Sequence, residues 1–371
     1  MKVGIPREVK NHEYRVAVTP AGTRELVSHG HEVYLEKDAG AGSSLGDDVY
    51  VAAGATIVPD ADEVWGVADL VLKVKEPVAE EYHRMRPGQV LFTYLHLAAS
   101  RECTDALLSR GVTSIAYETV QLPDGSLPLL APMSEVAGRM APQVGAHHLQ
   151  REGGGRGVLM GGVSGVYAAK VVVLGAGVSG MNAAAIALGM QAEVLLVDKN
   201  VTRLRQADAI YQGHLQTVAS NTYEIERAVL DADLVIGAVL VPGAKAPMLI
   251  SNDLVSRMLP GSVLVDISID QGGCFEDSHP TTHAEPTYKV HNSVFYCVAN
   301  MPGAVPHTST YALTNVTLPY ALELANLGWR DALRSDAALL PGLHTHEGAL
   351  TIQPVAEAHG LPWTAPEQVL R

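Results

Sequence analysis

The stretch that decides the fold of this chain is Lys170-Val-Val-Val-Leu-Gly175-Ala-Gly177-Val-Ser-Gly180. Its apolar, β-branched start predicts a buried parallel strand, and the glycine spacing that follows predicts a tight turn into a helix from Val178 to Met190. A second apolar run, Glu193–Val197, predicts the next strand, which ends at Asp198. Strand, glycine turn, helix, strand and terminal acid in this order are typical of a dinucleotide-binding unit.

The glycine turn and the acid are suited to different parts of a dinucleotide. Glycines at Gly175–Gly180 let a pyrophosphate approach the helix N-terminus, where backbone N–H groups and the helix dipole favour an anion. Asp198 lies 18 residues after Gly180, where a carboxylate accepts hydrogen bonds from the adenosine ribose. A carboxylate there repels a 2′-phosphate and favours NAD over NADP, although Lys199 and Arg203 weaken this preference. The alternative is a glycine turn in a Rossmann-like scaffold that binds no cofactor.

Apolar runs of strand length alternate with helix-length segments along nearly the whole chain. Such alternation predicts an α/β fold in which helices cover both faces of parallel sheets. The predicted strands form two series. The first is Lys2–Ile5, Glu32–Leu35, Asp69–Lys73, Val90–Tyr94 and Ser114–Tyr117, and the second is Lys170–Leu174, Glu193–Val197, Leu234–Ala238, Ser262–Ile267 and Val294–Val298.

Capping residues and prolines mark the predicted helices. Two long helices are predicted over Ser134–Gln150 and Thr308–Leu327. Ser134 is expected to cap the first of them, Pro142 to kink or interrupt it, and Pro319 to interrupt the second. Shorter helices are predicted to follow the N-cap residues Thr19 and Ser100.

The order of the predicted elements indicates two domains. The second strand series and the long helix before it place a Rossmann domain for NAD at residues 129–307. The helical tail is expected to return to the first strand series. Residues 1–128 and 308–371 are therefore expected to form one discontinuous, substrate-binding domain.

Composition excludes several classes of function. The chain has 371 residues, with 26 Lys and Arg against 40 Asp and Glu, and its formal charge of −14 disfavours binding to nucleic acid or to an anionic membrane surface. Three cysteines without a CxxC pair are typical of a reducing compartment. The sequence shows no signal peptide and no apolar run of about 18 residues that would span a membrane. A cytoplasmic protein is therefore expected.

Charged side chains near the ends of predicted strands are the candidates for chemistry. Arg15, just before a helix cap, suits bidentate binding of a carboxylate, but a solvated arginine fits the pattern equally well. Lys73 and Lys75 share one side of a strand end, where either can meet a carboxylate or carbonyl or remain an exposed charge. His96 suits proton exchange near neutral pH, or else is a structural histidine. Asp270 follows a strand of the second series, where such sheets bind ligands.

Several stretches resemble the bacterial L-alanine dehydrogenase family, and together they extend over essentially the whole chain. Related folds occur in the NAD(H)-binding subunit of proton-pumping transhydrogenase and, more distantly, in saccharopine dehydrogenases, which are the alternative relatives. The matching stretches are Gly4–Lys10, Arg15–Pro20, Leu72–Pro77, Tyr94–Ala99, Ala131–Gly138, Gly175–Gly180, Val265–Gly273, Asn300–Pro302 and Thr308–Tyr311.

The resemblance implies two Rossmann-like domains with a cleft between them, a homohexamer, and reversible NAD-dependent oxidative deamination of L-alanine to pyruvate and ammonium. It implies that Arg15 and Lys75 bind substrate oxygens and that His96 and Asp270 are the catalytic pair. It further implies a cofactor site lined by Ser134, Gly175, Gly177, Val178, Gly180, Asp198, Arg203, Ser220, Val239, Leu240, Ile267, Asp270, His279, Val298, Asn300 and Met301.

Neither the motifs nor the resemblance indicates a metal site. The 15 histidines show no HExxH pattern. Some members of the family bind a divalent ion through a glutamate at position 118 and a histidine at position 327, but residue 327 is leucine here. Glu118 alone is a poor site for such an ion, because Mg²⁺ shares its carboxylate ligands with further oxygens.

Two other functions are compatible with a dinucleotide-binding chain. One is a module that passes hydride to another domain, and the other is a non-catalytic NAD(H) sensor. Neither function needs a carboxylate-binding pair or a proton-exchanging histidine, so Arg15, Lys75, His96 and Asp270 favour an enzyme that is complete in one chain.

Overall fold

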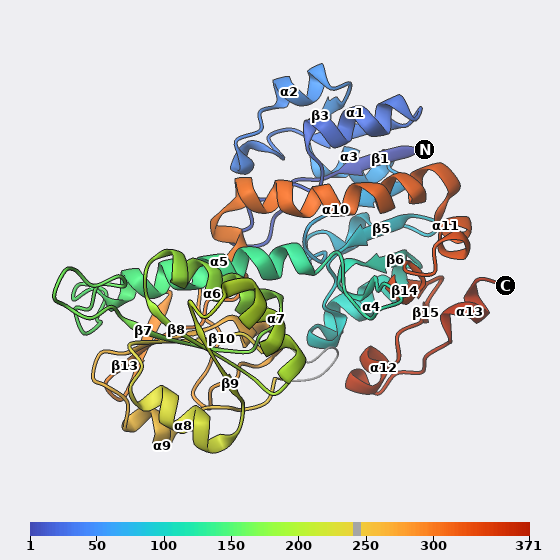
Figure 1. Ribbon diagram of the computed structural model, residues 1–371. Coiled ribbons are helices and arrows are strands. Elements are labelled where there is room, and N and C mark those ends of the chain that lie inside the picture. The colour runs from blue at the N-terminus through green and yellow to red at the C-terminus, as the bar shows by residue number, and fades with distance from the viewer. Residues whose placement is uncertain (240–245) are drawn as a thin grey trace. The chain divides into compact units, whose positions relative to one another are not determined.

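The computed structural model describes residues 1–239 and 246–371. The chain divides into two compact units: unit 1 comprises Met1–Met133 and Val305–Arg371, and unit 2 comprises Ser134–Ala304. Each unit contains a largely parallel sheet with helices packed on it (Figure 1), which confirms the predicted α/β class. Within the described ranges, no helix combines the length and the apolar character that crossing a bilayer requires.

Unit 2 is built on a sheet with the strand order β12-β13-β11-β10-β7-β8-β9. The strands from β7 to β11 and β13 pair in parallel, and β12 runs antiparallel to β13 at the edge. Taken along the chain, the parallel strands follow the Rossmann order 3-2-1-4-5-6. The bounds are β7 (Lys170–Leu174), β8 (Glu193–Asp198), β9 (Gln216–Ala219), β10 (Leu234–Gly237), β11 (Val263–Asp266), β12 (Thr287–Val290) and β13 (Ser293–Tyr296).

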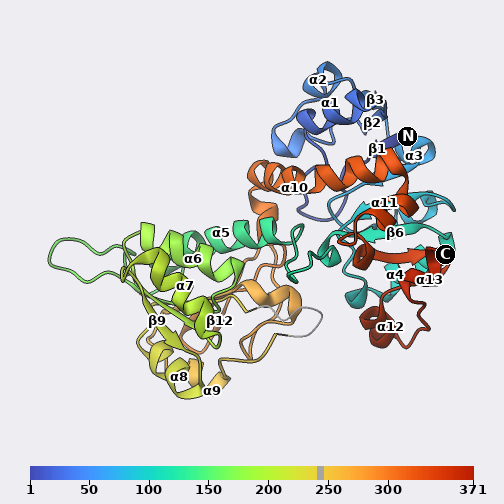
Figure 2. The same ribbon diagram turned by 45° about the vertical axis from the view of Figure 1, so that its right-hand side comes forward.

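Helices cover both faces of the sheet in unit 2. In the views of Figures 1 and 2, α6 and α7 lie on one side of the strands, and α8 and α9 lie on the other. The fully buried Val235 and Leu264 belong to the core beneath them, which explains the continuous apolar runs of these strands. The helix bounds are α5 (Ala131–Leu149), whose first residues belong to unit 1, α6 (Val178–Gly189), α7 (Val201–Tyr211), α8 (Thr222–Leu230) and α9 (Asn252–Ser256).

Unit 1 repeats this strand order and extends it. Its sheet has the order β15-β14-β6-β5-β4-β1-β2-β3, so that β1 to β6 follow the 3-2-1-4-5-6 pattern again. The added strand β14 runs antiparallel to both β6 and β15. The bounds are β1 (Lys2–Ile5), β2 (Glu32–Glu36), β3 (Thr56–Val58), β4 (Leu70–Leu72), β5 (Val90–Thr93), β6 (Thr113–Ala116), β14 (Leu343–His346) and β15 (Ala349–Leu350).

The helices of unit 1 include the two whose N-caps were predicted. Thr19 Oγ1 accepts a hydrogen bond from Gly22 N, and Ser100 Oγ accepts one from Cys103 N. The late helix α10 packs on α1 (Figure 2). The bounds are α1 (Pro20–Ser28), α2 (Asp47–Ala52), α3 (Ala61–Val67), α4 (Arg101–Arg110), α10 (Pro306–Leu327), α11 (Trp329–Ser335), α12 (Gln353–His359) and α13 (Pro366–Val369).

Both predicted long helices are present, but the predicted cap at Ser134 and the predicted interruptions at the two prolines are wrong. Helix α5 begins at Ala131, so Ser134 lies in its first turn and does not cap it. Pro142 and Pro319 lie inside helices that continue through them. A proline inside a helix removes one hydrogen bond and costs about 3 kcal/mol, and the remaining bonds and packing of a helix this long offset that cost.

Sequence patterning missed the short strands β3, β9, β12, β14 and β15. These strands have between two and four residues, and several are half polar, so their apolar runs are too short to stand out. Two of the missed strands, β12 and β14, run antiparallel to their neighbours. Both sheets are therefore mixed at one edge and not purely parallel as predicted.

Candidate functional site

In unit 1, the candidate residues follow the carboxyl ends of neighbouring parallel strands. The segment with Arg15 follows β1, the segment with Lys75 follows β4, and His96 and Glu118 follow β5 and β6. The strand order reverses between β1 and β4. Ligands of open α/β sheets bind at the carboxyl ends of the strands beside such a reversal, and parallel pairing therefore brings these four segments to one edge of the sheet.

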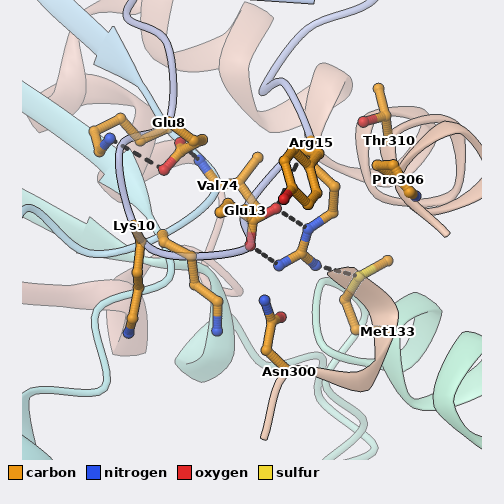
Figure 3. A network of polar contacts seen from close by, with 12 residues as sticks. Glu8, Lys10, Glu13, Arg15, Val74, Met133, Asn300, Pro306 and Thr310 are labelled. Atoms are coloured by element: carbon orange, nitrogen blue, oxygen red, sulfur yellow. Dashed lines mark hydrogen bonds and ion pairs between the residues drawn. The ribbon is translucent and has the colours of Figure 1, made fainter. Parts of the chain in front are cut away.

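Arg15 is held in place by a bidentate ion pair. Its Nε donates to Glu13 Oε1 at 2.6 Å and its Nη2 donates to Glu13 Oε2 at 2.5 Å, while Nη1 lies 3.0 Å from Met133 Sδ (Figure 3). Arg15 is 2% exposed. Burial lowers the pKa of Arg15, but the charge and the hydrogen bonds of Glu13 together raise it by more than burial lowers it. The pKa of Arg15 is therefore raised overall. Arg15 is thus a buried and oriented cation, and the solvated arginine is ruled out.

The loop that carries Arg15 is tied to the start of α10. Thr310 Oγ1 accepts a hydrogen bond from Val16 N at 3.2 Å, and it lies 2.8 Å from Ser43 Oγ. Ser43 Oγ in turn lies 3.0 Å from the carbonyl oxygen of Tyr14. Residues on both sides of Arg15 are therefore fixed by contacts with segments that are distant in sequence.

The structure separates the roles of the two lysines after β4. Lys73 is fully buried, and its Nζ lies 3.1 Å from Glu8 Oε2 and 2.9 Å from Glu81 Oε1. Glu8 Oε1 also accepts a hydrogen bond from Val74 N at 2.6 Å (Figure 3). Lys75 is only partly buried. Lys73 is enclosed by two carboxylates, and Lys75 is the more exposed of the two lysines.

His96 adopts a left-handed backbone conformation (φ 47°) that is uncommon for residues other than glycine. The Glu118 carboxylate supports it by accepting hydrogen bonds from His96 N at 2.7 Å and from Leu95 N. The imidazole Nδ1 lies 3.9 Å from Glu118 Oε1, and the ring stacks parallel to Tyr94 with centroids 5.7 Å apart. The His96 side chain is 42% exposed.

Glu118 also lies beside a buried histidine on β14. Burial alone raises the pKa of Glu118, but His96, His344 and backbone hydrogen bonds lower it overall. His344 is 2% exposed, and its Nε2 lies 2.9 Å from Thr119 Oγ1. Within the described part of the chain, His344 Nδ1 has no hydrogen-bond partner.

Protonation of His344 is expected to destabilise unit 1 in acid. Burial lowers the pKa of His344 from 6.5 to about 4, so its contribution to stability is complete above pH 6.5 and is lost as the pH falls toward 4. The shift corresponds to about 3 kcal/mol of unfolding free energy. Urea denaturation across this range should show a loss in the wild type that His344→Gln lacks, and parallel pH curves for the two proteins would contradict the assignment.

In unit 2, the glycine turn has the predicted geometry. Gly175 has φ 108°, and Gly177 immediately precedes α6, whose first residue is the exposed Val178. A Cβ at Gly175 would lie 2.5 Å from the Ala238 carbonyl oxygen, and one at Gly180 would overlap the carbonyl oxygen of Gly175. At Gly177 a Cβ would meet nothing closer than Arg203 Nη1, at 3.9 Å. Gly175 and Gly180 thus allow the turn itself, and Gly177 leaves open space beside it.

Asp198 joins the glycine turn to the next strand. Its Oδ2 accepts a hydrogen bond from Ala176 N and its Oδ1 accepts one from Asn200 N, both at 2.6 Å. Arg203 Nη1 lies 3.9 Å from Asp198 Oδ2. A carboxylate has about four acceptor sites, so these bonds leave capacity for ribose hydroxyls. Asp198 therefore fixes the glycine turn through Ala176 and keeps carboxylate oxygens with acceptor capacity.

The ends of β10, β11 and β13 carry several of the other predicted cofactor residues. Val239 follows β10, and Ser268 Oγ contacts both its carbonyl oxygen, at 2.7 Å, and its N, at 3.1 Å. The short 3-10 helix Ile267–Gln271 follows β11 and contains the exposed Asp270. After β13 come the buried Val298 and Met301, and Asn300, which has φ 64°.

Ser220 and His279, two further predicted cofactor residues, do not lie at the ends of these three strands. Ser220 follows β9, and its N donates to the carbonyl oxygen of Asp198. His279 is exposed, stacks on Tyr288 of the edge strand β12 with centroids 3.7 Å apart, and follows no strand end. Leu240 lies outside the described residues.

Among the described residues, no group of three or more His, Cys, Asp or Glu side chains is arranged to hold a metal ion. Glu118 is engaged with backbone N–H groups, and Leu327, at the end of α10, has no ligand atom in its side chain.

The sequence shows Glu8 and Glu13 clustered with Lys10 and Arg15 after the first strand, but the supporting role of these acids was not predicted. Glu13 stands two residues before Arg15, and this spacing places both on one side of an extended segment, which is a signal that was available. Asp266 stands two residues before Ser268, a spacing typical of a side-chain cap. Glu81 had no local signal, because it meets Lys73 only through the tertiary fold.

Family models of two domains match most of the chain. The family described as alanine dehydrogenase/PNT, N-terminal domain matches residues 4–137, and the family described as alanine dehydrogenase/PNT, C-terminal domain matches residues 141–353. The chain is 65% identical over 370 residues to the alanine dehydrogenase of Mycobacterium tuberculosis, and 53% identical over 371 residues to that of Methanococcus maripaludis, with 100% of each chain covered.

Solved structures agree with this assignment. A structure of L-alanine dehydrogenase superposes with a TM-score of 0.94 at 51% identity and covers 97% of this chain and 99% of that one. A transhydrogenase structure from Sinorhizobium meliloti superposes with a TM-score of 0.80 at 25% identity and covers 94% of this chain and 98% of that one. The chain therefore belongs to the alanine dehydrogenase/PNT family.

Proposed function

We propose that this chain is an NAD-dependent L-alanine dehydrogenase. It converts L-alanine, NAD⁺ and water into pyruvate, ammonium, NADH and one proton, and it also runs in reverse. The single observation that carries this proposal is the buried, glutamate-oriented Arg15 at the carboxyl edge of a Rossmann-type sheet that also presents Lys75 and His96. A nucleotide carrier or sensor has no use for such an anion-binding and proton-exchanging set.

Arg15 and Lys75 bind the oxygens of the substrate. Glu13 fixes the plane of the guanidinium by its bidentate bonds and so limits the orientations in which Arg15 can meet a carboxylate. A positioned carboxylate in turn orients the Cα–H bond of alanine, which removes much of the entropic cost of the reaction.

His96 and Asp270 move the protons. Oxidation of the amine releases a proton from nitrogen, and hydrolysis of the resulting imine requires a proton to be taken from water and delivered to the departing ammonia. His96 exchanges protons at the substrate oxygen, and Asp270 accepts a proton from the amine or from water. General acid–base help of this kind contributes about 10²–10⁴-fold.

The residues of unit 2 fit NAD by their chemistry. The open space beside Gly177 at the start of α6 suits a pyrophosphate, and Asp198 retains acceptor capacity for ribose hydroxyls. When bound, the cofactor supplies a hydride acceptor. The other residues assigned to this site are Ser134, Gly175, Val178, Gly180, Arg203, Ser220, Val239, Leu240, Ile267, Asp270, His279, Val298, Asn300 and Met301.

In this proposal residues 1–128 and 308–371 bind substrate and residues 129–307 bind NAD. The enzyme acts in the cytoplasm as a homo-oligomer, a hexamer as the family resemblance implies. Light scattering of the purified chain measures that state.

The purified chain is expected to form NADH from NAD and L-alanine, as measured by absorbance. His96→Ala should lower kcat by about 10²–10⁴-fold, because general acid–base help is lost. The matched control is His83→Ala, since His83 is an exposed histidine with 61% of its side chain accessible and lies 4.0 Å from Asp62.

Three outcomes of this assay are distinct. Wild-type turnover in His96→Ala would refute the catalytic role of His96. No NADH from alanine, with NAD binding retained in calorimetry, would refute the dehydrogenase and favour the sensor. Turnover of another amino acid in preference to alanine would keep the reaction class and replace the substrate.

A further inference from the structure

A fully buried carboxylate lies at the carboxyl end of β11, four residues before Asp270. Asp266 is 0% exposed. Its Oδ1 accepts a hydrogen bond from Ser268 N at 2.9 Å, and its Oδ2 accepts bonds from Cys274 N at 2.8 Å and from Ser278 Oγ at 2.6 Å. Every group that bonds to Asp266 is thus a donor. Burial raises the pKa of Asp266, and the hydrogen bonds from Ser278, Cys274 and Ser268 offset part of that rise.

These bonds close the loop that contains Asp270. Ser268 and Cys274 lie on either side of Asp270 in the sequence, and Asp266 bonds the backbone of both. The loop returns through Gly272 and Gly273, which have φ of 90° and 79°. A Cβ at Gly273 would lie 2.5 Å from Ser278 Cβ and 2.9 Å from Asp266 Oδ2, so the return is tightly packed against the acid.

The same acid is connected to a second strand end. Ser268, whose N bonds Asp266, uses its hydroxyl to donate to the Val239 carbonyl oxygen at 2.7 Å, and the hydroxyl lies 3.1 Å from Val239 N. Val239 follows β10. In the sheet β10 pairs with β7, the strand that leads into the glycine turn. Asp266 therefore connects the loop after β11 with the end of β10.

We propose that Asp266 is a positioning residue that sets Asp270 and, through Ser268, the Val239 end of β10 for the reaction. This inference rests on the proposed dehydrogenase function, in which Asp270 moves protons and Val239 lines the cofactor site. Asp266 is too deeply buried to touch substrate, so it acts through the loop that it closes.

The test is Asp266→Asn compared with Asp233→Asn. Asn has the same size as Asp, but an NH₂ group replaces one of the two carboxylate oxygens. This group cannot accept a hydrogen bond from the donors that face it, so the loop is no longer closed on that side. Asp233 is the matched control, because it is 8% exposed and accepts bonds from Lys170 N at 2.8 Å and Arg156 Nη1 at 2.9 Å. It lies before β10, at the amino end of the strands.

In Asp266→Asn we expect kcat for alanine to fall about 100-fold, the scale of a 1 Å misplacement of a reacting group. The KM for alanine should stay within about threefold, because Arg15 and Lys75 are unchanged. Hydrogen exchange should accelerate about tenfold at the amide that faces the new NH₂ group, either Ser268 N or Cys274 N, since that amide loses a bond of about 1.4 kcal/mol. Asp233→Asn should keep kcat and leave these amides protected.

Equal kcat losses in the two variants, or unchanged exchange at Ser268 and Cys274, would overturn the inference. If the wild type forms no NADH from alanine, the proposed function fails, while hydrogen exchange still decides whether Asp266 holds the loop. Should Asp266→Asn not fold, Ser278→Ala removes a single bond to Oδ2 and should show the same kcat effect in weaker form, with KM unchanged; a wild-type kcat there would count against the proposal.

Discussion

Gly180→Ala is expected to weaken NAD binding by about 100-fold and to lower the free energy of unfolding by about 1–3 kcal/mol. The physical reason is steric. A Cβ at this position overlaps the carbonyl oxygen of Gly175, which is backbone and cannot rotate away. Helix α6 must then move away from the turn, and the N–H groups that would face a pyrophosphate move with it. Titration with NADH, followed by fluorescence, measures the affinity, and thermal unfolding measures the stability.

Two glycines of the same helix region serve as controls. Gly189, at the end of α6, has open space where a Cβ would stand, with no neighbouring atom within 4 Å, so Gly189→Ala should retain affinity and stability. Gly177→Ala should retain stability, because its backbone is extended (φ −80°) and its Cβ has space. It should nevertheless lose affinity, since that space is where the pyrophosphate approaches. Wild-type affinity in both Gly177→Ala and Gly180→Ala would refute the assignment of the turn to a dinucleotide.

Lys73→Met is expected to destabilise the chain by about 3–5 kcal/mol, because it leaves the buried carboxylates of Glu8 and Glu81 without their cation. Burial already raises the pKa of Glu8 to about 7, against the opposing effect of Lys73. An acid with a raised pKa stabilises the folded state most at low pH, and this contribution is lost as pH rises from 4.5 through 7. The defect of Lys73→Met should therefore be larger at pH 8 than at pH 5. Urea denaturation at the two pH values measures it.

A matched surface variant and a compensated variant identify the cause. Lys10 pairs with Glu76 but has 42% of its side chain exposed, so Lys10→Met should cost only about 0–1 kcal/mol. Combining Lys73→Met with Glu8→Gln and Glu81→Gln removes the uncompensated charges and should restore much of the stability. If the triple variant is no more stable than Lys73→Met, the loss comes from packing and the ion-pair explanation is wrong.

Local patterns were sufficient to predict the elements that carry both sheets. Lys170–Leu174 is a strand with the bounds predicted, and Asp198 ends the next one. Buried parallel strands need continuous apolar runs, and a tight turn with φ of 108° needs glycine, so both are visible in single segments. Edge strands such as Ala349–Leu350 are too short to have a pattern, and they form because β14 is already paired with β6.

Within the candidate site, the sequence determined which side chains follow the strand ends, because parallel strands bring their carboxyl ends to one edge. It left open whether Arg15 was solvated and which of Lys73 and Lys75 was available. The tertiary structure decided both. Glu13 and Met133 enclose Arg15, and Glu8 and Glu81 enclose Lys73. Burial and ion pairing depend on residues that are distant in sequence, such as Arg15 and Met133, which are 118 positions apart, and no local pattern records such partners. The sequence thus determined the two Rossmann-type sheets and their glycine turn, and only the folded chain decided which charges are enclosed and which remain accessible.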